Sequence, residues 1–497
     1  MGRRRGHDPR YARIGGTDPA PRRAPFPHPA AGGCLGATRS TRRDSRREMG
    51  IMNRSFFAAG AALVCLCMAQ PLSAQFGSAV PSTGSSSWNP SGYDYYASST
   101  QPSPSDLPSV PSGVPEAVSY ELGPECESSC CGPWRLMPDW PACFTATGWL
   151  AGGGAANADR PASRFNGPLT FADRHEMMAN QAYAVIERQA DGSQGLDIGA
   201  RLDLLYGTDH YFTQGVGLET DRTGAPKWNN HRFYGLAMPQ AYLDFAYGDW
   251  SVKVGHFYSF LGNDSVMAPN NFFHTQSYAR QYAEPFTFTG VLSTYRLTDR
   301  LTLLSGIHSG WDVFDRYTER AAYMGGWRWT GPDGLFTLAF GVTSGHELNP
   351  ADFYGNRTLY TLVATMQLTD RLRYVLQHDH GWQRDYFAAG VDAEWYGLNQ
   401  SLFYEINDCW AWGTRFEWFR DDDGARVTGV RPTNPIAGLS YAGNFYEVGT
   451  GLNWFPTHNL TIRPEIRWDW FDGVGLPFDD GAKDNQFVGA FDIILAW

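Results

Sequence analysis

Apolar and polar residues alternate with a period of two along most of the chain from about residue 143 to its end. In the last eleven residues, four apolar side chains fall on one face, while the only charge, Asp492, falls on the other with Ile494. The four are Phe491, Ile493, Leu495 and Trp497. This periodicity predicts a β-strand with one apolar side. Similar alternation occurs in residues 195–206, 410–420 and 459–470.

The connections between these segments alternate between short and long. Short connections contain the Asp, Asn and Gly residues that favour hairpin turns, as at Asp249, Asp299 and Asp370. Seven short and eight long connections predict about sixteen strands, the first near residues 143–153 and the last at 487–497. Because this number is even, the two termini of the barrel are expected on the short-turn side. The predicted long connections are residues 154–179, 208–236, 259–283, 313–320, 346–355, 383–393, 421–441 and 471–486.

Composition narrows the fold class. The chain has 497 residues, of which 18% are charged and 15% aromatic, and no apolar run is long enough for a spanning helix. Strand-length apolar segments and tryptophans near strand ends are typical of outer-membrane barrels, whose aromatic girdles lie at the two interfaces. The pattern therefore predicts an all-β, single transmembrane antiparallel up-and-down β-barrel. A soluble all-β protein, with its apolar face inside, is the alternative, because alternation alone does not say which face is inside.

The N-terminal region differs in amino-acid composition from the predicted barrel. Residues 1–48 form an Arg/Pro-rich extension, interpreted as a mis-assigned start before Met49 or Met52. Residues 49–74 are expected to be a signal peptide, because an apolar stretch follows Arg54 and leads into small residues. Residues 75–142 are expected to be a Ser/Pro-rich, Cys-containing periplasmic linker, and residues 143–497 the outer-membrane barrel.

Charge and cysteine content change with this division. Residues 1–74 hold 13 of the 40 basic and 4 of the 51 acidic residues, so the remainder carries 27 against 47, or about −20. Such a surface makes nucleic acid an unexpected partner. Five cysteines remain in the mature chain, and they could chelate a metal or form disulfides; no zinc or haem spacing is present. They are Cys126, Cys130, Cys131, Cys143 and Cys409. No cofactor or metal is expected.

Five short segments carry a family resemblance. They are residues 163–168 (SRFNGP), 201–209 (RLDLLYGTD), 255–258 (GHFY), 268–273 (APNNFF) and 284–292 (EPFTFTGVL). Together they resemble the OmpL-like β-barrel porins (β-barrel porin type 2) over about residues 144–497. The resemblance implies a porin-like protein in the outer membrane of a Gram-negative-type envelope, and it carries over no catalytic residue and no defined solute.

If the apolar faces meet lipid, the polar faces line the barrel interior, which is wide enough for an aqueous channel at sixteen strands. The pore-lining candidates are Arg201, Asp203, Lys253, Arg373, Arg415, Glu417, Arg463, Glu465, Arg467 and Asp469. These charges either select ions or satisfy one another along the wall. The connection 259–283, with Asn270 and Asn271, either folds into the pore as a constriction or packs over the barrel mouth.

The predicted function is passive diffusion of small hydrophilic solutes or ions, without catalysis. The alternatives are a plugged structural or adhesin-like barrel and, less favoured, an outer-membrane lipase. His378 and His380 invite a metal site, but the alternation places both on the lipid side. Expected partners are outer-membrane lipid, the barrel-assembly machinery and small solutes, with a homotrimer by analogy. The assembly signal is expected in Phe491, Ile493, Leu495 and Trp497.

Overall fold

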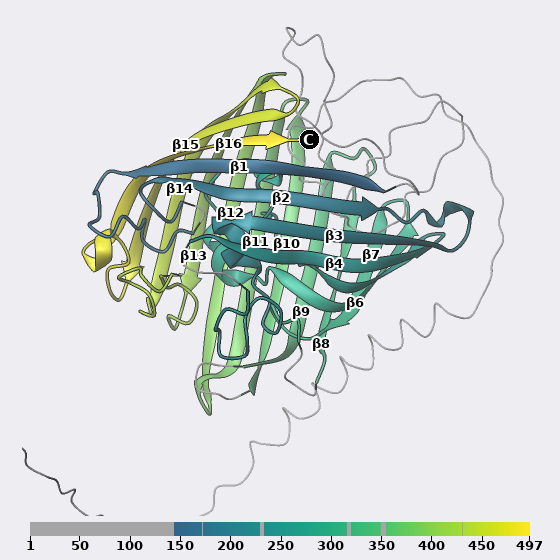
Figure 1. Ribbon diagram of the computed structural model, residues 1–497, viewed down its shortest axis with the longest axis horizontal. Coiled ribbons are helices and arrows are strands. Elements are labelled where there is room, and N and C mark those ends of the chain that lie inside the picture. Colours follow the sequence, from purple (N-terminus) through teal and green to yellow (C-terminus); the bar gives the residue numbers. More distant parts are fainter. Residues whose placement is uncertain (1–143, 171, 229–232, 316–319, 349–353, 430) are drawn as a thin grey trace, which may run out of the picture. The chain divides into compact units, whose positions relative to one another are not determined.

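The chain forms a closed barrel of sixteen antiparallel strands in the computed structural model (Figure 1), which describes residues 144–497 except 171, 229–232, 316–319, 349–353 and 430. Each strand pairs with its sequence neighbours. The strands are β1 Thr145–Asn157, β2 Met177–Arg188, β3 Asp197–Gly207, β4 Gly235–Tyr247, β5 Trp250–Tyr258, β6 Thr287–Thr298, β7 Leu301–His308, β8 Ala322–Thr330, β9 Phe336–Leu348, β10 Tyr354–Thr369, β11 Leu372–Ala388, β12 Val391–Asn407, β13 Trp410–Asp421, β14 Gly443–Thr457, β15 Leu460–Gly473 and β16 Asn485–Ala496.

The alternation seen in the sequence separates an apolar outer surface from a polar inner one. On β15, Arg463, Glu465 and Arg467 are buried, whereas Ile466 and Trp468 are each 49% exposed on the outside. Aromatic pairs lie on this outer surface; the Trp410 and Trp454 rings, for example, stack at 5.6 Å. Polar residues inside and apolar residues outside are the arrangement of a membrane barrel, so the soluble all-β alternative is wrong.

The last strand closes the barrel against the first, as the alternation predicted (Figure 1). Trp149 pairs with Ala496, and the register continues to Asn157 opposite Val488. Beyond β16, the Trp497 carbonyl accepts a hydrogen bond from Gly148 N (3.1 Å), and Trp497 N donates to the Gly148 carbonyl (3.0 Å). Closure leaves no free strand edge, which a hydrocarbon environment requires.

The predicted turn pattern is confirmed with one correction. The seven short connections lie at one end of the barrel and the longer ones at the other. The predicted long connection 383–393 is wrong, because β11 runs to Ala388 and β12 starts at Val391. Ladder pairing continues to Ala388 opposite Val391, and Gly390, with a φ of 79°, allows the tight turn between them.

None of the helices in the described part of the chain is long and apolar enough to cross a membrane. The expected N-terminal extension, signal peptide and periplasmic linker lie outside the described residues, as do Cys126, Cys130, Cys131 and Cys143.

We expect removal of Trp497 to impair assembly more than conductance, because it deletes two seam hydrogen bonds that together contribute about 1–3 kcal/mol. The assay is heat-modifiable migration on gels after expression and after refolding. Trp497→Phe, which keeps both main-chain bonds, is the control and is expected to assemble normally. Normal insertion of the truncated chain would contradict the assembly-signal hypothesis.

Candidate functional site

The connection between β5 and β6, residues 259–286, enters the barrel; we call it the inner segment. Of the two alternatives left open by the sequence, the structure shows the inward one. No residue of the segment is exposed, and Tyr278 and Ala283 are fully buried. Asn270 is also buried, so it is not a tip that projects into solvent. The segment packs against inward side chains from both sides of the barrel.

Two wall carboxylates hold consecutive backbone N–H groups of this segment. Glu465 on β15 accepts hydrogen bonds from His274 N (2.8 Å) and Thr275 N (3.2 Å). Glu417 on β13 accepts from Tyr278 N (2.6 Å) and Ala279 N (2.7 Å). An irregular segment in a barrel interior has backbone groups without ladder partners, and these carboxylates satisfy four of them.

Three wall arginines hold its carbonyl groups. The guanidinium of Arg463 donates to the Ala268 carbonyl (2.8 Å) and to that of Asn271. Arg415 Nη2 donates to the Thr275 carbonyl (3.1 Å), and Arg467 Nη1 donates to the Gln276 carbonyl (2.6 Å). Donors and acceptors on strands β13 and β15 of the wall therefore hold the segment between residues 268 and 279.

The same arginines are neutralised by neighbouring carboxylates. Arg463 pairs with Asp492 (Nη2–Oδ2, 2.5 Å), and Arg467 pairs with Asp469 (Nη2–Oδ1, 2.7 Å). Arg415 pairs with Glu447 (Nε–Oε1, 2.9 Å), which also lies 3.3 Å from Arg467 Nη1. Sequence reasoning missed Glu447, although its inward position follows from the same alternation on β14.

Apolar contacts anchor the segment where it crosses the barrel. Val266 and Met267 pack with Trp149 and with Ile494, which explains why the polar face of the last strand carries an isoleucine. Further along, Phe272 and Phe273 pack in a cluster with residues of β11 to β14, among them Val375, Phe403, Ala411 and Phe455. These two clusters place the segment across the interior from β1 and β16 to β11–β14.

Of the four remaining pore-lining candidates, three lie on β3 and β5, away from this network, and Arg373 lies beside it on β11. Arg201 and Asp203 form a buried ion pair on β3 (Nε–Oδ1, 2.7 Å), and Glu187 lies 3.2 Å from Arg201 Nη1. Lys253 Nζ lies 4.2 Å from the centroid of the Tyr242 ring. Arg373 lies over Phe403, 4.9 Å from the ring centroid. The structure thus places Arg201, Asp203 and Lys253 on β3 and β5, and Arg373 next to the phenylalanines that hold the inner segment.

Inward residues remain accessible at the short-turn end of β6–β12. They are half-buried and mostly polar, and we call this region the vestibule. Its members include Thr302, Arg328, Thr337, Thr365, Gln367, Arg373 and Glu405. Their inward direction follows from the strand register, since Thr365 pairs with the buried Val375 and Arg328 with the buried Ala339.

The residues that invited other chemistry are engaged structurally. His378 Nδ1 lies 2.9 Å from the Gly397 carbonyl, and His380 Nε2 lies 2.7 Å from Glu394 Oε1. Among the described residues, no group of three His, Cys, Asp or Glu side chains is arranged to hold a metal ion. Cys409, in the turn between β12 and β13, is disulfide-bonded.

Solved structures similar to this chain include three outer-membrane proteins. Each match covers 71% of this chain. The outer-membrane channel DcaP of Acinetobacter baumannii is 12% identical, with a TM-score of 0.49 and 97% of its own chain covered. The anion-selective porin from Comamonas acidovorans is 9% identical (TM-score 0.49, 99% covered). OmpT of Vibrio cholerae in a trimer form is 8% identical (TM-score 0.44, 99% covered).

No curated protein matches this chain closely enough to count as a relative. A family model does match, and it covers residues 143–497, which is the whole barrel. The model is described as "Putative beta-barrel porin-2, OmpL-like". The match agrees with the resemblance carried by the short segments and with the closed sixteen-strand barrel. The chain therefore belongs to the OmpL-like beta-barrel porin-2 family and is an outer-membrane porin.

Proposed function

We propose that the barrel conducts small hydrophilic solutes or ions by passive diffusion and that the inner segment forms its constriction. The observation that carries the proposal is the fixed path of this segment across the interior, above a polar vestibule. A segment held by wall charges narrows the lumen without depending on its own flexibility. The vestibule supplies the wet, polar wall that a solute needs on entry.

The start of the segment packs closely against β9 and β10. Phe260 and Leu261 are buried there beside Leu359 and Thr361. A Cβ atom on Gly341 would lie 2.4 Å from Leu261 Cδ2, so only glycine permits this approach. We assign Phe260 and Leu261 the role of the constriction between the vestibule and the long-loop end.

The ten pore-lining candidates take different roles in this proposal. Arg415, Glu417, Arg463, Glu465, Arg467 and Asp469 position the inner segment. The three arginines are paired with neighbouring carboxylates, and Glu417 and Glu465 are occupied by backbone N–H groups, so we assign this set a structural role and not ion selectivity. Arg373, Arg328 and Glu405 are half-buried in the vestibule, and we assign ion selectivity to this set.

The alternative functions make different demands on the interior. A plugged structural barrel conducts nothing, so single-channel recording in planar bilayers separates it from a porin. We propose that the chain is not an enzyme; a lipase would release fatty acid from phospholipid micelles, and a single Ser or His substitution would abolish this. A homotrimer stays a prediction, which chemical cross-linking of the detergent-solubilised protein tests.

Widening the constriction is expected to raise conductance. In the variant Phe260→Ala/Leu261→Ala, we expect single-channel conductance to increase by roughly a factor of two or more, because the lost side chains fill space between the segment and the wall. Leu204→Ala, on the lipid-facing side of β3, is the matched control and should leave conductance unchanged. An unaltered conductance in the double variant, with normal heat-modifiable migration, would place the constriction elsewhere.

Removing one wall arginine is expected to release the inner segment. Arg467→Met leaves Asp469 without its ion-pair partner and Glu447 with Arg415 alone, and should destabilise the fold by about 3–5 kcal/mol. Urea unfolding measures the loss, and limited proteolysis detects cleavage within residues 259–286. Arg467→Lys keeps the charge and should fall between the wild type and Arg467→Met. Equal stability and protease resistance in all three proteins would refute the anchoring role.

A further inference from the structure

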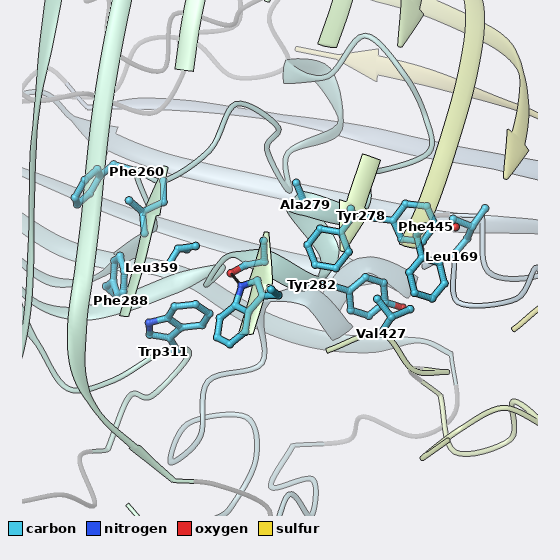
Figure 2. Close-up of a cluster of buried hydrophobic side chains, with 14 of the residues drawn as sticks. Leu169, Phe260, Tyr278, Ala279, Tyr282, Phe288, Trp311, Leu359, Val427 and Phe445 are labelled. Atoms are coloured by element: carbon cyan, nitrogen blue, oxygen red, sulfur yellow. Dashed lines mark hydrogen bonds between the residues drawn. The ribbon is translucent and has the colours of Figure 1, made fainter. Parts of the chain in front are cut away.

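Two tryptophans and two arginines meet at the long-loop end of the interior, beside the last residues of the inner segment; we call this group the mouth site. Trp395 Nε1 donates a hydrogen bond to the Ala283 carbonyl of that segment (3.2 Å). Trp311 follows β7 and Trp395 faces inward from β12; their rings lie 6.3 Å apart at 85°. Figure 2 shows Trp311 at the edge of the buried apolar cluster that includes Tyr282 and Val427. The cluster forms the floor of the mouth site.

Both arginines lie over these indole rings. The Arg357 guanidinium carbon is 4.7 Å from the centroid of the Trp311 ring. That of Arg426 is 5.6 Å from the Trp311 centroid and 4.8 Å from the Trp395 centroid. Such stacking holds a guanidinium by its flat face and leaves its edge nitrogens directed sideways. Two cations are thereby brought to one aromatic pair.

Neither of the two guanidiniums has a carboxylate partner among the residues that the structure describes. Arg357 donates through Nε to Gln383 Oε1 (2.7 Å), and Arg426 donates through Nε to the Tyr282 carbonyl (2.6 Å). The terminal nitrogens of both side chains, which are half-buried, form no further described bond. Six other interior arginines each pair with a carboxylate: Arg201, Arg280, Arg415, Arg431, Arg463 and Arg467.

Three neighbouring carboxylates are used by the backbone instead. Asp421 accepts hydrogen bonds from Ala425 N (2.8 Å), Arg426 N (2.7 Å) and Val427 N (2.8 Å). Glu347 Oε1 accepts a hydrogen bond from Trp311 N (2.9 Å). Asp312 Oδ1 accepts from Phe286 N (3.0 Å) and Thr287 N (2.8 Å). Glu347 and Asp312 thereby order the loop that carries Trp311, and none of the three carboxylates forms an ion pair with Arg357 or Arg426.

A third donor at the site also lacks a partner. Gln383 on β11 is fully buried, and its Nε2 atom has no hydrogen-bond acceptor, while its Oε1 atom is taken by Arg357. A buried amide N–H without an acceptor is unfavourable by about 1–3 kcal/mol. The mouth site therefore has guanidinium and amide donors for which the described side chains supply no acceptor.

The two charges also disfavour each other. Burial, together with the neighbouring Arg357 charge, lowers the pKa of Arg426 to about 10. The residue remains a cation at neutral pH, and the nearby charges of Asp421 and Asp312 offset only part of this lowering. A bound anion would relieve both the repulsion and the loss of hydration, as ion pairs do for the other interior arginines.

We propose that the mouth site binds a small solute bearing an oxyanion, carboxylate or phosphate, through Arg357, Arg426 and Gln383. This proposal rests on the proposed porin function, because it names the class of solute that would enter the channel from the long-loop side. The oxyanion accepts hydrogen bonds from the free guanidinium nitrogens and from Gln383 Nε2. The two indoles fix the guanidiniums, so little side-chain ordering remains to be lost on binding.

The test is isothermal titration calorimetry on the full detergent-solubilised chain, with glucose 6-phosphate, succinate and glucose as probes. Glucose should not bind, and at least one of the two anions should bind. Binding of only glucose 6-phosphate identifies a phosphate site, and binding of only succinate identifies a carboxylate site. No binding of either anion to the wild-type chain would overturn the proposal.

Substitution locates the binding. Arg357→Gln and Arg426→Gln are each expected to weaken binding by about tenfold, and the double variant to abolish it, because each removes a charge-assisted contact. Arg420→Gln is the matched control, since Arg420 also lies at the long-loop end but pairs with Asp422. Affinity unchanged in the double variant, with normal heat-modifiable migration, would show that the anion binds elsewhere and would refute the assignment.

Conductance of the same preparations separates this inference from the porin function. A conducting wild-type channel that does not bind the anions overturns the mouth site alone. Anion binding that is lost in the double variant supports the mouth site, whether or not the chain conducts. Absence of conductance in the wild-type chain would overturn only the channel function.

Discussion

Main-chain pairing around a closed ring is the constraint on which the rest of the structure depends. In a bilayer, each unpaired N–H or C=O facing lipid costs several kilocalories per mole, so the wall must have no free edge. Trp497 and Gly148 complete the ring through two hydrogen bonds. Once the ring is closed, the two-residue period assigns each side chain to lipid or to the interior. The polar residues of the wall are thereby collected in an interior that must then satisfy them.

The interior does so by pairing its charges with one another and with the inner segment. Arg415, Glu447 and Arg467 form one connected group, and Arg463 and Asp492 form a second. Both groups also bind backbone atoms of residues 259–286. This double use of wall charges lets a non-ladder segment lie inside a membrane barrel, because its backbone partners come from side chains. The mouth site departs from this rule in one respect, since Arg357 and Arg426 form no direct ion pair with a carboxylate among the described residues, although Arg426 also binds the inner segment.

Strand number, closure and the direction of the side chains could be predicted because each is local or periodic. The alternation in residues 459–470 assigned Arg463 and Glu465 to the interior. The even strand count placed the start of the first strand and the end of the last strand on the short-turn side. The error at 383–393 has a physical cause, since β11 and β12 extend their pairing beyond the length that crosses a bilayer and end in a tight turn at Gly390. Polar residues there resembled a loop, although the ladder resumes at Ala388 and Val391 after a register shift that follows Gln383.

The sequence by itself determined the barrel, its sixteen strands, its apolar exterior and the identity of most interior charges, because a two-residue period and turn chemistry are properties of neighbouring residues. Only the tertiary structure decided which charges meet, that the inner segment lies inside the barrel, that Ile494 supports it, and that Trp311 and Trp395 collect two arginines. Those contacts join residues more than a hundred positions apart in several cases, as with Glu417 and Tyr278. Their geometry depends on the register and closure of the whole ring, which no local pattern records.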